Sequence, residues 1–69
     1  MIRVEVNGQQ QDIQPGTSLT ALLSLLNVTP ERVAVELNLT VIDRKQLDCV
    51  SLKAGDHIEI ISFVGGGRN

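Results

Sequence analysis

Residues 58–69 read IEIISFVGGGRN, an apolar strand that runs without a linker into three glycines. Successive side chains of a strand point to opposite faces, so Ile58 and Ile60 share one face while Ile61 and Phe63 share the other. We expect the first pair to face a covering helix and the second pair to face outward. A glycine segment placed directly after a strand projects from a rigid body, and without Cβ atoms it is thin and conformationally free.

The opening of the chain predicts a hairpin. Apolar and charged residues alternate over residues 2–6, the pattern of a half-buried strand. Asn7-Gly8 follows, and this dipeptide is the strongest short hairpin signal. Residues 9–14 form the expected return strand, which we place at a sheet edge because it is mostly polar. Pro15-Gly16 then breaks the strand.

One substantial helix of about ten residues is expected after this break. Leucines recur on one helical face at positions 19, 22, 23 and 26. Thr17 or Ser18 supplies an oxygen that accepts from the backbone N–H groups of the first turn. Asn27 is the expected end of the helix.

Shorter elements fill the space between this helix and the final strand. Residues 33–37 alternate and predict a third strand, and Asn38 turns the chain. Residues 41–42 predict a short strand segment. Asp43 is expected to cap a brief helical turn over residues 44–46, with Leu47 pointing inward. Residues 50–52 are expected to be extended.

This order of elements predicts an α+β fold. One hairpin cannot cover a leucine-striped helix, so the first and last strands must lie side by side in the middle of the sheet. The predicted fold is a β-grasp, a four- to five-stranded mixed sheet with one main helix packed on one face. Residues 1–64 form this domain, and residues 65–69 form a flexible glycine-rich tail.

Composition narrows the possible functions. Hydrophobic residues make up 42% of the 69 residues and only Phe63 is aromatic, so the core must be aliphatic. So short a chain forms one domain and leaves no room for an elaborate catalytic cavity. Eight acidic residues against six basic ones give a net charge of −2. There is no basic run, so nucleic-acid binding is not expected.

Cysteine usage and hydropathy point to the cytoplasm. Cys49 is the single cysteine, so no internal disulfide forms, and no Cys/His cluster has zinc spacing. We interpret Cys49 as a partly buried structural residue. The charged, alternating opening of the chain is not typical of a signal peptide, and no apolar run is long enough to span a membrane.

The remaining polar candidates carry weak signals. His57 is expected to be half exposed at the start of the last strand, with no Ser, Cys or carboxylate partner in view. Asp56 is expected to organise the turn before it. Arg44-Lys45 is a solvated pair of charges or, at most, a partner contact.

The exposed end of the final strand has two readings. In the first, a docking patch for a partner protein is formed by Ile61, Phe63 and the adjoining Val64. In the second, short loops cover the Ile61 and Phe63 side chains. The sequence alone gives these readings equal weight.

The glycines have three readings. A glycine-rich end is ordinarily frayed. A phosphate-binding loop opens a helix and often carries a Lys, neither of which follows here. The functional reading is a tail that presents a carboxyl group: residues 64–67, fully extended, reach roughly 13 Å, enough to enter the active site of a docked partner.

These residues together resemble the ThiS family of sulfur carriers. The resemblance covers nearly the whole chain and rests on five motifs: NG at residues 7–8, PGT at 15–17 leading to LL at 22–23, VAVELN at 33–38, AGD at 54–56, and IEI followed by FVGGG over 58–67. It implies a ubiquitin-like β-grasp fold. It also implies that a ThiF-like enzyme adenylates the C-terminal glycine, using ATP and Mg²⁺ that the carrier itself does not bind. Sulfur relayed from a cysteine desulfurase then displaces AMP, and thiazole synthase receives the sulfur from the resulting thiocarboxylate.

Carried onto this chain, the resemblance makes Gly67 the acceptor, with Gly65 and Gly66 as its flexible approach. The family usually ends at glycine, whereas Arg68-Asn69 follows here and places the Gly67 carboxyl in a peptide bond. We therefore expect a peptidase to remove these two residues. Two further departures concern turns: Asn38-Leu39 stands where relatives often have Asn-Gly, and Asp43-Arg44 where they commonly have Pro-Arg.

Two alternatives stay open. The related MoaD carriers of molybdopterin synthesis share the fold and the Gly-Gly end, but they are usually longer and richer in aromatic residues. The second alternative is a ubiquitin-like interaction module whose tail is never activated. Such a module would bind a partner through Ile61, Phe63 and the sheet surface. A self-contained enzyme has no supporting site in the sequence.

Overall fold

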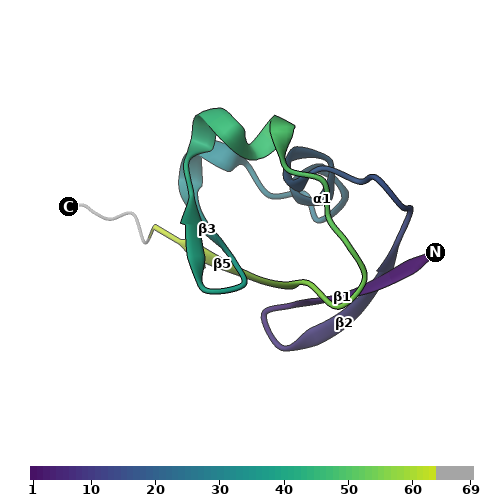
Figure 1. Ribbon diagram of the computed structural model, residues 1–69. Coiled ribbons are helices and arrows are strands. Elements are labelled where there is room, and N and C mark those ends of the chain that lie inside the picture. Colours follow the sequence, from purple (N-terminus) through teal and green to yellow (C-terminus); the bar gives the residue numbers. More distant parts are fainter. Residues whose placement is uncertain (64–69) are drawn as a thin grey trace.

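A computed structural model describes residues 1–63 of the chain, and a five-stranded sheet forms its body (Figure 1). Its strands are β1 (Ile2–Val6), β2 (Gln9–Ile13), β3 (Val33–Leu37), β4 (Thr40–Ile42) and β5 (His57–Ser62). The helical elements are α1 (Leu19–Leu25) and two 3₁₀ helices, η1 (Pro30–Arg32) and η2 (Arg44–Cys49). The predicted edge position of the polar return strand is confirmed, because β2 borders the sheet.

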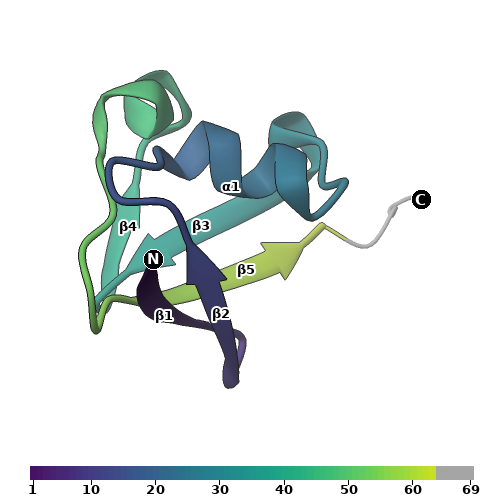
Figure 2. The same cartoon turned by 90° about the vertical axis from the view of Figure 1, so that its right-hand side faces the viewer.

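The sheet is mixed, with strand order β2-β1-β5-β3-β4. The first and last strands lie side by side and parallel at its centre, through the pairs Glu5↔His57 and Val6↔Ile58. All other pairings are antiparallel. Helix α1 crosses one face of this sheet (Figure 2). The predicted β-grasp, with its central parallel pair, is confirmed.

The core is aliphatic and lies between α1 and the sheet. Within the described residues, every buried side chain is hydrophobic; the set is Val4, Val6, Ile13, Leu19, Leu22, Leu23, Val33, Val35, Leu47, Leu52 and Ile58. The alternation predicted for β5 is visible in this set, since Ile58 is only 1% exposed. Ile60 packs partly against the same core.

Helix α1 is shorter than the sequence predicts, with seven residues rather than about ten. Its start is as expected, because the Ser18 side chain accepts a hydrogen bond from the Ala21 N–H at 3.0 Å. Leu26 already has non-helical dihedral angles, and Asn27 follows with φ +58°. That left-handed residue ends the helix at the expected place, and Leu26 packs against the core just beyond the last helical residue.

The segment after β4 corrects two expectations. Asp43 precedes η2, but its side chain makes no capping bond; instead its carbonyl accepts from the Gln46 N–H at 2.8 Å. Cys49 is exposed rather than partly buried. A 3₁₀ helix repeats every three residues, so Leu47 and Val50 occupy the inward positions and Cys49 does not. The inward position of Leu47 is confirmed.

Both hairpins use two-residue turns whose central residues have positive φ. The values are +49° and +83° at Asn7-Gly8, and +51° and +73° at Asn38-Leu39. Type I′ turns require this backbone, which glycine adopts without cost and asparagine tolerates. Leu39 therefore sits in a conformation that is unfavourable for its side chain, and that side chain is 92% exposed.

The two turn asparagines also bind strand β5. The Asn7 amide donates to the Ile60 carbonyl at 3.1 Å and accepts from the Ile60 N–H at 2.7 Å. The Asn38 side chain accepts from the His57 N–H at 2.9 Å and donates to the Asp56 carboxylate at 3.1 Å. Both hairpins thus hold the strand that leads to the glycine segment.

No helix formed by residues 1–63 is both long enough and apolar enough to cross a membrane.

Replacing Leu39 by glycine is expected to raise the free energy of unfolding by about 0.5–1 kcal/mol, because glycine adopts positive φ freely. The substitution loses little packing, since the leucine is almost fully exposed. Chemical denaturation measures the change. The matched reverse substitution is Gly8→Leu, where an added Cβ meets no atom within 4 Å. It should destabilise the protein through its backbone alone; equal stabilities for L39G and wild type would contradict this account.

Replacing Asn7 by glycine is expected to cost about 1 kcal/mol of stability, because the turn is kept while both bonds to Ile60 are lost. Amide hydrogen exchange at Ile60 should accelerate. Asn38→Gly is the control, since it releases His57 and leaves the Ile60 contacts intact. Unchanged exchange at Ile60 in N7G would show that the Asn7 side chain does not hold this strand.

Candidate functional site

The predicted docking residues lie at the end of β5. Ile61 is 48% exposed and Phe63 is 57% exposed, so loops within the described part of the chain leave both uncovered. Their outward position is confirmed. Val64, the tail glycines Gly65 and Gly66, and the predicted acceptor Gly67 lie outside the described residues, as does the predicted flexible tail, and their roles stay predictions.

Strand β5 is held on one side as far as Ile60 and on the other side as far as Phe63. On one side Asn7 binds Ile60 through two hydrogen bonds. On the other side the Phe63 N–H donates to the Arg32 carbonyl at 2.9 Å, one step beyond the last pair with β3. The residue that precedes Val64 therefore has a fixed position relative to the sheet.

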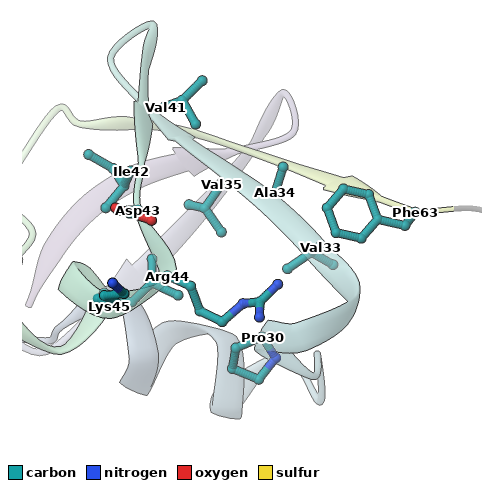
Figure 3. Close-up of a pocket in the computed structure, with 11 residues that line it drawn as sticks. Pro30, Val33, Ala34, Val35, Val41, Ile42, Asp43, Arg44, Lys45 and Phe63 are labelled. Atoms are coloured by element: carbon teal, nitrogen blue, oxygen red, sulfur yellow. The ribbon is translucent and has the colours of Figure 1, made fainter.

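An open groove of about 550 Å³ lies beside this end of β5 (Figure 3). Phe63 and the β3 residues Val33 and Ala34 line it on one side. Arg44 and Lys45, at the start of η2, line it on the other. The sequence described this cationic pair only as solvated or as a partner contact, and its position beside Phe63 fits the second description.

The outer face of the sheet is more apolar than the sequence indicated. Val41, which the sequence did not single out, is 67% exposed and pairs with Glu36. Ala34 pairs with the exposed Ile61 on the neighbouring strand. The available signal was alternation within the short β4 strand, because Ile42 packs inward and Val41 must then face outward.

The polar candidates fall into structural roles. Asp56 organises its turn as predicted, accepting from the Lys53 N–H at 2.8 Å. His57 has a carboxylate neighbour that the sequence did not reveal: its Nδ1 lies 3.8 Å from Glu5 Oε2, because the parallel pairing places the two residues side by side. Both side chains are partly open to solvent, so this contact is weak.

A surface ion pair joins β1 and β2, the two strands of the first hairpin. Arg3 Nε donates to Asp12 Oδ1 at 2.9 Å. The hydrogen bond, reinforced by the arginine charge, lowers the pKa of the Asp12 carboxyl. The pair lies across the β1–β2 register and is exposed, so it contributes little to stability.

The described residues do not assemble a reaction centre around these groups. No group of three His, Cys, Asp or Glu side chains within residues 1–63 is arranged to hold a metal ion. Cys49 is exposed and lies on η2, away from the β5 residues that lead to the tail. What the described geometry offers is a rigid body, an exposed apolar strand end and a groove beside it.

Comparison with solved structures supports this description. The crystal structure of the thiamine biosynthesis protein ThiS from Geobacter metallireducens superimposes with a TM-score of 0.83 at 38% sequence identity. The similarity covers 96% of this chain and all of that one. It confirms the ubiquitin-like β-grasp fold.

Curated sequences give two further relatives. A thiazole synthase of Magnetococcus marinus is 38% identical over 68 residues, which are 99% of this chain and 21% of that protein. The chain thus spans about a fifth of this relative's length. An uncharacterised protein, ycf40, of Porphyra purpurea is 33% identical over 96% of this chain and 93% of its own length.

The family comparison covers both the body and the glycine segment. The ThiS family pattern matches residues 4–67, which is almost the whole sequence. The chain therefore belongs to the ThiS family.

Proposed function

We propose that this chain is a sulfur carrier of thiamine biosynthesis and that Gly67 bears the transferred sulfur. The observation that carries this proposal is the continuity between β5 and the glycines. The strand is held on one side as far as Ile60, by Asn7, and on the other side as far as Phe63, by Arg32. Residues 64–67 follow it directly within the family match. A rigid body that ends in glycines suits the delivery of one carboxyl group into a partner.

The chemistry assigns catalysis to the partners. A carboxylate is a poor electrophile, and forming an acyl adenylate with loss of pyrophosphate supplies AMP as a leaving group. The terminal sulfur of a persulfide formed by a cysteine desulfurase then attacks the acyl carbon, and AMP leaves. A thiol reduces the resulting acyl disulfide, which releases the thiocarboxylate and leaves a disulfide on the sulfur donor. Adenylation needs contacts to Mg²⁺ and the ATP phosphates, which a ThiF-like enzyme supplies in this proposal. The carrier is a co-substrate that works in the cytoplasm.

The two residues after Gly67 require a prior step. Gly67 is joined to Arg68 by a peptide bond, so a peptidase must hydrolyse that bond before the carboxylate can react. The small glycines on the other side of this bond leave it sterically open.

The names of the relatives favour thiamine over the alternative pathway. One relative is called thiazole synthase and one solved structure is called thiamine biosynthesis protein, which supports a thiazole destination over a MoaD-like role. Thiazole synthase is accordingly the proposed recipient of the sulfur.

A second function remains in contention because of the exposed strand end. Ile61 and Phe63 are open to solvent beside a groove, as a ubiquitin-like interaction module without an activated tail also requires.

Mass spectrometry tests the carrier function directly. A chain shortened to end at Gly67, incubated with a ThiF-like enzyme, ATP, Mg²⁺, a desulfurase with cysteine and a thiol reductant, should gain the mass of one sulfur in place of one oxygen. The full 69-residue chain should gain it only after loss of Arg68-Asn69. Absence of both adenylate and thiocarboxylate on the shortened chain contradicts the carrier function; failure of the full chain alone contradicts only the trimming step.

Deletion of residues 65–69 separates the two functions. The variant should keep its free energy of unfolding within about 0.5 kcal/mol, because terminal residues beyond the last strand add little burial. Under the carrier function it should not restore growth without thiamine in a strain lacking its own carrier, whereas the full chain should. Complementation by the deleted variant would favour the interaction module. Ile61→Ser in the full chain is the companion variant, expected to weaken partner binding while the tail stays intact.

A further inference from the structure

Two carboxylates face each other across strands on the outer face of the sheet. Glu36 of β3 pairs directly with Glu59 of β5 in the antiparallel register. Their neighbours along each strand, Val35 and Ile58, are buried against the helix, so both glutamates lie on the face that α1 does not cover. Like charges placed directly opposite each other destabilise a sheet.

The described residues offer this pair little compensation. Residues 1–63 contain the ion pair of Arg3 with Asp12 and the contact of His57 with Glu5, and neither includes Glu36 or Glu59. His57 shares the outer face with Glu59, two positions along β5, but its imidazole lies beside Glu5. This part of the face therefore carries an excess of negative charge.

Apolar side chains frame the carboxylates. Val41 pairs with Glu36 on its other side, so the row across three strands reads Val41, Glu36, Glu59. The next row toward the end of β5 holds Ala34 and Ile61. Val41 and Ile61 are 67% and 48% exposed. We call these five residues the acidic patch.

We propose that the acidic patch is the contact surface for thiazole synthase, and that it receives a lysine or arginine side chain flanked by apolar residues. This inference rests on the proposed function, since it names the surface through which the carrier meets its recipient. The partner is chosen because relatives named thiazole synthase contain a stretch similar to this whole chain. The chemistry of the contact follows from charge complementarity.

The partner supplies the positive charge that the free protein lacks beside Glu36 and Glu59. A cation set between Glu36 and Glu59 converts a repulsive pair into two favourable contacts, and the apolar frame excludes water around it. The patch also includes Ile61, the residue before Ser62 and Phe63 at the end of the body. Docking there brings the partner beside the end of β5, the last part of the body before residue 64.

The experiment compares three single-charge variants. Binding of purified thiazole synthase from the same organism is measured by calorimetry for wild type, Glu36→Gln, Glu59→Gln and the control Glu31→Gln. Glu31 is exposed on η1, outside the patch, and its replacement changes net charge equally. Each patch variant should bind about fivefold more weakly at low salt and lose part of its salt dependence, while E31Q binds like wild type.

Thermal unfolding distinguishes a contact from a structural role. E36Q and E59Q should unfold at the same temperature as wild type or higher, because each substitution removes repulsion. Unchanged binding by both patch variants, or equal weakening by E31Q, overturns the proposal. A wild-type chain that does not bind thiazole synthase also overturns it. The carrier function fails separately, through absence of the thiocarboxylate on the chain ending at Gly67.

Discussion

The rest of the structure depends on the position of β5 between β1 and β3. On the β3 side it is paired along five residues, from Ser62 to Ile58. On the β1 side it has only two pairs, because β1 turns away at Asn7. The Asn7 amide then binds both the N–H and the carbonyl of Ile60, where the next residue of a longer β1 would pair. A side chain thereby extends the central pairing toward the end of the strand.

The two turn asparagines meet two requirements at once. A two-residue hairpin needs positive φ at its first central position, which Asn tolerates better than most residues with a side chain. An amide at that position also carries a donor and an acceptor. Asn7 uses both on Ile60 of β5. Asn38 accepts from the His57 N–H of β5 and donates to Asp56, the residue before that strand. Glycine would adopt the positive φ of the turn, but it has no side chain to bond β5. Asparagine meets both requirements.

Local patterns made most of the fold predictable. Alternation, leucine spacing and turn dipeptides depend on neighbouring residues, and they placed every strand and the helix. The misses depend on geometry that neighbouring residues do not determine. Asn7 reaches a strand 53 residues away, and the contact between Glu5 and His57 exists only once β1 and β5 are parallel. Cys49 was misplaced because the expected helical turn covered residues 44–46, whereas η2 continues to Cys49 and its inward residue is Leu47.

Features that are unfavourable for the stability of the free protein lie on one side of the sheet, and the stabilising core lies on the other. On the side covered by α1, the described core is hydrophobic throughout and contains no buried polar or charged side chain. The uncovered side carries two facing glutamates and the open side chains of Val41 and Ile61, none of which helps the free protein to fold. A chain of this size has little stability to spare, so features that reduce it persist where they serve another molecule. The two facing glutamates and the open side chains of Val41 and Ile61 lie together on the uncovered face, which is why the contact with thiazole synthase is proposed there.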